Sequence, residues 1–278
     1  MKDKISVVTV IHNEENIIKR CLDSVKDIAD EILIVHDGPC NDKTIEICKK
    51  YTKNIFVRTH KGLPAMHLAY LFRKVKNNWI LKIDADEFLS KPLQKDILNL
   101  IKNKRADAYE FNWPYWNGEK YATRDWPKKI ALYRKSKISY LGFPHWDTPE
   151  INGNIIKSNY QLEHRHFTSG AIPTWKEFRE KAIGRYLRLQ AEYTIKDFKE
   201  LDSFQYSKKD FPIQMKIRRN FPLLSAFPFA IGAGLKILLS KNAWKEGPPV
   251  FAEAFGCVIY YFYLGVYIHK LKTKSQKD

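Results

Sequence analysis

Cysteine is scarce in this chain, and its spacing builds neither a disulfide framework nor a metal site. The 278 residues contain four cysteines, Cys21, Cys40, Cys48 and Cys257, with no CxxC pair among them. This usage fits reduced thiols in a cytosolic compartment. The N-terminus also lacks the apolar stretch and small-residue cleavage site of a secretory signal peptide. We therefore expect a protein that works on the cytosolic side of a membrane.

Acidic residues are outnumbered. Lys and Arg total 48 against 31 Asp and Glu, which gives a net charge of +17 and a pI near 9.5. Such a field attracts phosphates, nucleic acids or anionic lipid head groups, and charge alone does not choose among them. The length suits one large domain with an appendage, or two modest domains.

The first ninety residues alternate β-branched runs with segments of helical spacing. This alternation predicts an α/β fold, a mostly parallel, doubly wound sheet flanked by helices, with ligands beyond the carboxyl ends of the strands. Strands are expected over 5–11, 31–35, 54–58 and 79–83, and helices over 17–25 and 44–51. The loops expected to line a site are 12–16, 36–42, 60–64 and 84–88.

The rest of the chain changes character twice. After about residue 105 it is rich in aromatics and turn residues, which favours antiparallel strands and long loops that could stack on sugars or bases. Residues 175–193 have a basic, helical pattern. Two apolar stretches, 221–239 and 250–268, approach the length of a membrane span but contain prolines or charges. We favour helices lying in the membrane interface over spanning helices.

Carboxylates gather where an expected strand ends. Asp84-Ala85-Asp86 follows the apolar run "WILKI". Carboxylates held this close need a neutralising cation, and Mg²⁺ or Mn²⁺ shared with substrate phosphates is the simplest one. Glu87, the next residue, is expected to support the loop.

Three blocks carry a family resemblance. "VVTVIHNEENIIKRCLDSV", "ADEILIVHDGPCNDKTIEIC" and "NNWILKIDADEFL" resemble successive blocks of the family 2 glycosyltransferases. The resemblance implies an inverting enzyme with a GT-A catalytic domain over 1–170, divided into a nucleotide-binding half, 1–105, and an acceptor half, 106–170. A helical, membrane-associating region, 171–278, would follow. Later segments, "ALYRKSKISYLGFPHWDTPEI" and "LEHRHF", resemble the branch that builds lipopolysaccharide cores and related envelope glycans.

The resemblance also assigns roles to single residues. Asp37 would accept hydrogen bonds from the nucleobase, although capping of the following turn is an alternative. Asp84 would lie near the ribose or the metal, and Asp86 would bind the metal. The remaining donor contacts implied are Thr9, His12, Asn13, Glu14 and Lys61.

An inverting transfer also needs a base for the acceptor hydroxyl. Asp147 and Glu150 in "HWDTPE" are the candidates, with Glu150 ahead, and each could instead be a surface turn residue. His164 and His166 alternate, so on a strand they share one face. One of them could complete the metal shell, or both could be structural.

These observations lead to one main hypothesis and two rivals. The main hypothesis is a metal-dependent transfer from a UDP- or GDP-sugar to a lipid-linked or lipopolysaccharide-type acceptor. The nearer rival has a polyprenyl phosphate as acceptor. A nucleic-acid-binding protein would explain the charge but not the carboxylates, so we expect no nucleic-acid partner.

The basic residues of the last third could attract an anionic membrane surface, or they could form a solvated helix face. They are Arg179, Lys181, Arg185, Arg188, Lys216, Arg218 and Arg219.

Overall fold

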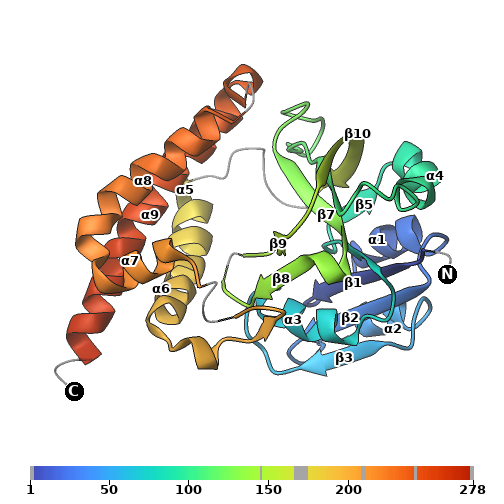
Figure 1. Ribbon diagram of the computed structural model, residues 1–278, viewed down its shortest axis with the longest axis horizontal. Coiled ribbons are helices and arrows are strands. Elements are labelled where there is room, and N and C mark those ends of the chain that lie inside the picture. The colour runs from blue at the N-terminus through green and yellow to red at the C-terminus, as the bar shows by residue number, and fades with distance from the viewer. Residues whose placement is uncertain (1–2, 145, 166–174, 208–210, 241–242, 276–278) are drawn as a thin grey trace.

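The protein is built on one large mixed sheet (Figure 1). The computed structural model describes residues 3–144, 146–165, 175–207, 211–240 and 243–275. Eight strands form the sheet in the order β3-β2-β1-β4-β7-β6-β10-β5, and a three-stranded sheet has the order β11-β8-β9. The strands are β1 (Ile5–Ile11), β2 (Glu31–Asp37), β3 (Ile55–Arg58), β4 (Trp79–Lys82), β5 (Glu87–Leu89), β6 (Ala108–Asn112), β7 (Lys128–Arg134), β8 (Ile138–Leu141), β9 (Glu150–Ile151), β10 (Ile155–His164) and β11 (Ser203–Phe204).

The predicted parallel half of the sheet is confirmed. β1 pairs in parallel with β2 and with β4, and β2 pairs in parallel with β3. β7 then runs antiparallel to both β4 and β6, which confirms the expected change of texture after residue 105. β10 returns parallel to β6 and carries β5 on its other edge in antiparallel pairing.

Alternate residues of the central strands pack against different helices, as a sheet buried on both faces requires. Ile5 and Val7 of β1 belong to a core with α1 (Ile18–Val25) and α4 (Lys91–Leu100). Val8 and Val10 belong to a second core with α3 (Ala65–Lys74) and with Tyr140 of β8. The expected second helix is real but ends early, since α2 covers only Thr44–Cys48.

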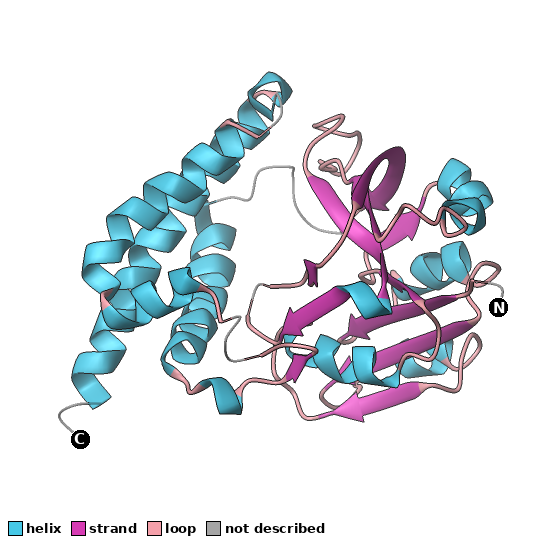
Figure 2. Ribbon diagram, viewed as in Figure 1, coloured by secondary structure: helices cyan, strands magenta, loops and turns pink. Residues whose placement is uncertain are grey.

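The chain after β10 forms a helical layer beside the sheet, which we call the helical arm (Figure 2). Its first helix runs without a break from residue 175 to 195 and includes a π-helical middle. The successive segments of the arm are α5 (Trp175–Glu177), η2 (Phe178–Leu187), α6 (Arg188–Ile195), α7 (Ile213–Asn220), α8 (Pro222–Leu238) and α9 (Pro248–Ser275). α8 and α9 lie side by side along the edge of the molecule farthest from the sheet.

Two glycines allow α8 and α9 to approach closely. A Cβ on Gly265 would lie 2.5 Å from the Cβ of Ala226, and one on Gly234 would lie 2.7 Å from Cγ2 of Val258. Larger residues at either position would force the helices apart. The pair is therefore a tightly packed hairpin.

The outer side of this hairpin is apolar and exposed. Within the part of the chain that the structure describes, one helix, Pro248–Lys274, has the length and apolar composition that a membrane crossing requires. α8 is shorter and has Pro228 in its interior. Length and composition alone do not distinguish a helix that crosses a bilayer from one that lies on it.

Candidate active site

Three loops meet at the carboxyl edge of the parallel strands. Because β1, β2 and β4 are adjacent and parallel, the segments that follow them share one edge of the sheet. The loop after β1 is fixed to the loop after β2: Asn13 N donates to His36 Nε2 at 3.3 Å and Glu14 N donates to Thr44 Oγ1 at 2.6 Å. The predicted clustering of these loops is confirmed.

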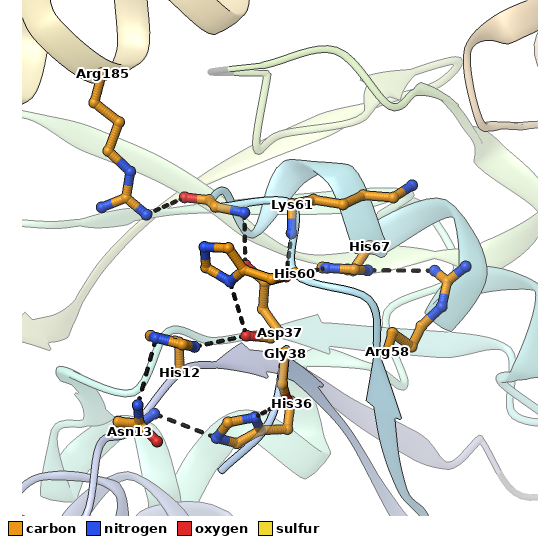
Figure 3. A network of polar contacts seen from close by, with 11 residues as sticks. His12, Asn13, His36, Asp37, Gly38, Arg58, His60, Lys61, His67 and Arg185 are labelled. Carbon is orange, nitrogen blue, oxygen red and sulfur yellow. Dashed lines mark hydrogen bonds and ion pairs between the residues drawn. The ribbon is translucent and has the colours of Figure 1, made fainter. Parts of the chain in front are cut away.

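Asp37, the last residue of β2, holds a neighbouring loop in place (Figure 3). Its buried carboxylate accepts hydrogen bonds from Lys61 N at 2.6 Å, Gly62 N at 2.8 Å and His67 Nε2 at 2.8 Å. Burial opposes the charge, but these hydrogen bonds outweigh it and keep the pKa of Asp37 below its usual value. A nucleobase would have to share this carboxylate with the loop at 60–62.

Histidines surround Asp37, and the sequence analysis did not foresee this. The exposed ring of His12 lies 5.7 Å from that of His36 and 4.9 Å from that of His60, centroid to centroid. His12 Nδ1 donates to the Asp37 carbonyl oxygen at 2.6 Å (Figure 3). The sequence contained one signal for this cluster: His12, His36 and His60 each stand at or just after the end of an expected strand. Together they present aromatic, hydrogen-bonding faces beside the site.

The helical arm reaches this same loop. Arg185 of η2 donates from Nη2 to the carbonyl oxygen of Gly62 (Figure 3). Gly62 has φ +81°, a left-handed conformation that favours glycine. Asp37 of β2 and Arg185 of the helical arm therefore both form hydrogen bonds with the loop at 60–62.

Asp84, at the end of β4, is neutralised by lysines. Lys82 Nζ lies 2.7 and 2.6 Å from its two carboxylate oxygens, and Lys129 Nζ lies 2.7 Å from Oδ2. Burial opposes ionisation, but Lys129 and Lys82 hold the pKa of Asp84 far below its usual range. Lysine ammonium groups thus neutralise Asp84 within the protein, and a metal contact of this residue stays a prediction.

Glu87 supports the loop, as predicted. The carboxylate is fully buried, and it accepts hydrogen bonds from Asp84 N at 2.9 Å and from Trp113 Nε1 at 2.6 Å. Lys129 also pairs with Glu87. One lysine from β7 thus joins two carboxylates of the loop after β4.

Asp86 is paired differently. Its Oδ2 lies 3.2 Å from Nε2 of His164, the last residue of β10, and the His164 ring stacks on Trp113 with centroids 4.0 Å apart. Carboxylate oxygen and imidazole nitrogen are common divalent-metal ligands. Among the described residues no group of three or more His, Cys, Asp or Glu could hold a metal ion, and His166 lies outside those residues. A metal here would need water and substrate oxygens to complete its shell, as Mg²⁺ usually does.

The pKa of Glu14 reflects its burial and the acidic residues around it. Burial and then the charges of Asp86, Asp42 and Asp84 raise its pKa from 4.5 to about 7. The charge of Asp86 thus acts on Glu14, and a cation bound at Asp86 would relieve this repulsion. The side chains present therefore fit a divalent cation at Asp86 and His164.

The two candidate bases lie in different surroundings. Asp147 is half-buried, and its charge helps to raise the pKa of Lys82, whose burial alone would lower it. Glu150 is exposed on β9, where its carboxylate accepts a hydrogen bond from Tyr206 at 3.2 Å. The two residues thus have different neighbours, Lys82 for Asp147 and Tyr206 for Glu150, and which of them acts as the base stays a prediction.

The remaining expected donor contacts are scattered. Thr9 is fully buried within β1, so it does not contact a donor in this conformation. Asn13 has φ 54° and accepts a hydrogen bond from Asn41 N at 2.9 Å, which fixes the edge of the site. Lys61 contributes its backbone to Asp37, and its ammonium lies 3.5 Å from the Met66 carbonyl oxygen.

Comparison with known proteins identifies the family. The family model described as glycosyl transferase family 2 matches residues 6–158, which is more than half of the chain and includes every strand of the parallel edge. The chain belongs to glycosyl transferase family 2. The GT-A fold expected from the sequence agrees with the observed sheet and its flanking helices.

Curated relatives match only part of the chain. An uncharacterized glycosyltransferase from Rickettsia bellii is 38% identical over 106 residues, 38% of this chain and 35% of that protein. The glycosyltransferase GlyA of Streptococcus pneumoniae is 28% identical over 125 residues, 41% of this chain and 17% of that protein. The chain thus spans about a third or less of the length of these relatives.

Solved structures resemble the chain more distantly. TarS residues 1–349 from S. aureus, in complex with UDP-GlcNAc, has a TM-score of 0.44 and 16% identity, over 92% of this chain and 90% of that one. Glucosyl-3-phosphoglycerate synthase from Mycobacterium tuberculosis, with Mn²⁺ and UDP-glucose, has a TM-score of 0.43 and 13% identity, over 60% of this chain and 72% of that one.

Replacing Lys129 by Met should destabilise the protein strongly. The substitution leaves Asp84 and Glu87 close together without the cation between them, which costs about 3–5 kcal/mol for a buried ion pair. Urea unfolding measures the effect. Lys128→Met is the matched control: its side chain is 34% exposed, so a loss of about 1 kcal/mol or less is expected. Equal losses in the two variants would contradict the buried-cation role.

Replacing Glu14 by Gln should change how stability depends on pH. Glu14 has a higher pKa in the folded protein, about 7, than its usual 4.5, so folding takes up a proton between these values. Its charge therefore lowers the free energy of unfolding as pH rises through this window. We expect the stability advantage of Glu14→Gln over the wild type to grow by on the order of 1 kcal/mol between pH 5 and 8, after allowance for solvent screening. Chemical unfolding at both pH values checks this, and a pH-independent difference would contradict it.

Proposed function

We propose that this protein is an inverting glycosyltransferase acting at the cytosolic face of a membrane. It would move a sugar from a UDP- or GDP-linked donor to a hydroxyl of a lipid-linked or lipopolysaccharide-type acceptor in cell-envelope glycan synthesis. The observation that carries the proposal is the pairing of Asp86 with His164 at the carboxyl end of β4, 3.2 Å apart. Family membership supplies the reaction class.

Asp86 and His164 would hold Mg²⁺ or Mn²⁺. When bound, such an ion stabilises the negative charge that develops on the leaving nucleoside diphosphate. Asp84 would serve as a fixed neighbour rather than a ligand, because both of its carboxylate oxygens are bonded to lysine ammonium groups. The stack of Trp113 on His164 holds the imidazole in one orientation.

The donor nucleoside would lie against the loops after β1 and β2. The exposed ring of His12 offers a stacking face, and Asn13 and Glu14 border it. The loop at 60–62, held by Asp37, would close the other side. Its fixed backbone orients the donor before the reaction, which is where a transferase gains most of its rate advantage.

Asp147 would take the proton of the acceptor hydroxyl. As the acceptor oxygen forms its bond to the anomeric carbon, the bond between that carbon and the diphosphate oxygen breaks on the opposite face. The proton passes to the Asp147 carboxylate. Asp147 is suited to this role because its charge acts on Lys82, next to Asp84.

The helical arm would hold the enzyme on anionic lipid. Exposed apolar side chains recur every three or four residues along α7 and α8, a spacing that places them on one side of the helices. Leu224 and Leu239 are the most exposed, at 79% and 78%. The other members of this stripe are Ile213, Ile217, Phe221, Phe227, Ile231 and Leu235.

The basic residues suggested by the sequence differ in their contacts. Arg179, Lys181, Arg185, Arg188 and Lys216 are exposed, and of these Arg185 and Arg188 also bond to Gly62 and Glu192. Arg218 lies between the rings of Phe229 and Tyr261, and Arg219 bonds to Lys196.

Replacing Asp86 by Asn should abolish most turnover. Loss of the carboxylate removes the main ligand for the ion, and we expect kcat/KM to fall by at least about 100-fold with the best UDP- or GDP-sugar in Mn²⁺. Asp27→Asn is the control, since Asp27 is exposed before β2, at the opposite edge of the sheet. Undiminished activity of Asp86→Asn, together with resistance of the wild type to EDTA, would overturn the metal assignment.

Replacing the two candidate bases separates two acceptor classes. With a hydroxyl acceptor, Asp147→Asn should lower kcat by about 100-fold or more, whereas Glu150→Gln should change it only a few-fold. A polyprenyl phosphate acceptor is already anionic and needs no strong base. Near-normal activity of both variants, measured with polyprenyl phosphate, would favour that rival; a larger loss in Glu150→Gln would contradict the choice of Asp147.

A further inference from the structure

A cavity of about 540 Å³ lies inside the helical arm, between its first helix and α9. This volume is in the range of small-molecule sites. Its walls are largely aromatic and apolar, formed by Trp175, Phe178 and Tyr186 on one side and by Phe255, Ile259 and Tyr260 on the other. The cavity is separate from the loops at the carboxyl edge of the sheet.

Each wall of the cavity is attached to the catalytic half of the protein. The helix that carries Phe178 and Tyr186 also carries Arg185, which bonds to Gly62 in the loop held by Asp37. On the opposite wall, Glu253 of α9 lies close enough to Tyr115, in the aromatic loop between β6 and β7, that its charge adds to burial in raising the pKa of the Tyr115 hydroxyl. A molecule in the cavity would therefore lie between one attachment to the donor loop and one to the expected acceptor half.

The attachment of α9 is reinforced just before that helix begins. Glu246 accepts hydrogen bonds from Arg124 N at 2.8 Å and from Asp125 N at 3.1 Å, both in the same aromatic loop. The cavity thus has a fixed position relative to the β6–β7 loop, which a bulk-membrane contact would not require.

The chemistry of the walls suits a hydrocarbon chain. A sugar would need many hydrogen bonds, whereas the lining is mostly apolar, and Tyr260 and Gln190 within it already bond to each other. Trp175 and Phe255 line the cavity and are also 60% and 66% exposed, so the cavity opens onto the protein surface. Phe251 and Phe262 continue this exposed apolar surface along α9.

A charged group marks one side of the opening. Lys181 lines the cavity and is exposed, so its ammonium can meet an anionic group without losing its solvation. Glu177, one helical turn before Lys181, and Glu253 also line the cavity, so Lys181 is the basic group among the described residues of the lining. An apolar chain with a phosphate at one end matches the aromatic walls and can place that phosphate at Lys181.

We propose that the cavity binds the hydrocarbon chain of the lipid-linked acceptor, with the anionic group of that lipid beside Lys181. This inference rests on the proposed function and names its acceptor class, a sugar acceptor carried on a single long apolar chain. The acceptor is recognised in two parts: its chain by the helical arm and its reacting end by the catalytic half. Acceptors with truncated chains lose affinity.

Binding of dodecyl phosphate, kept below its micelle concentration, tests the proposal by calorimetry on the full chain. The wild type should bind dodecyl phosphate and should bind butyl phosphate at least 10-fold more weakly. Ala252→Trp fills the cavity from α9 and should weaken dodecyl phosphate at least 10-fold. The matched control, Leu224→Trp, adds the same side chain on the exposed stripe and should bind like the wild type.

A second cavity variant guards against misfolding. Ala182→Trp fills the cavity from the opposite wall, and whichever of the two variants keeps the thermal unfolding temperature of the wild type is compared. That variant should still bind anionic vesicles, because its exposed stripe is intact. Equal affinity of the folded cavity variant and the wild type for dodecyl phosphate would overturn the proposal, as would equal binding of butyl and dodecyl phosphate.

Donor hydrolysis separates this proposal from the proposed function. The folded cavity variant should still hydrolyse the UDP- or GDP-sugar, since the side chains at the sheet edge are unchanged. If the wild type binds dodecyl phosphate but turns over no nucleotide-sugar, the proposed function fails while the chain-binding cavity stands. If turnover is present and the cavity variant binds the probe normally, only the cavity proposal fails.

Discussion

The ammonium of Lys129 is the contact on which this end of the sheet depends. Asp84 and Glu87 lie in one short loop, and like charges this close would repel strongly if nothing lay between them. Because β7 runs antiparallel beside β4, it delivers Lys129 to both carboxylates. Lys82 neutralises Asp84 from within β4 itself. Lys82 and Lys129 therefore neutralise Asp84 and Glu87 in the folded protein, so the stability of this loop does not depend on a bound metal.

The acidic residues at this edge of the sheet have different partners. Asp84 is matched by two lysines, and Asp37 is matched by the hydrogen bonds of the loop at 60–62. Asp86 pairs with His164 at 3.2 Å. Glu14 nearby has a pKa of about 7, first because it is buried and then because Asp86, Asp42 and Asp84 lie close to it.

Local pattern was enough to predict the parallel strands and the edge at which Glu14, Asp37 and Asp86 gather, since β-branched runs and strand-end carboxylates are local signals. It could not predict Lys129, whose partners are 42 and 45 residues away, because the antiparallel return of β7 decides that contact. The neighbours of the two candidate bases could not be predicted for the same reason: Asp147 and Glu150 look alike in sequence, and only their tertiary surroundings differ. The anchoring role of Asp37 likewise depends on backbone amides, which side-chain patterns do not report.

The helical arm and the donor loop are not independent. Arg185 lies on the helix that forms a wall of the cavity, and it also bonds to Gly62, whose amide is held by Asp37. A ligand that fixes the position of this helix would also restrict the loop, and by reciprocity a donor that orders the loop would restrict the helix. α8 and α9 lie on the far side of the first helix of the arm from the sheet, so the contact of Arg185 with the donor loop is made by the inner part of the arm.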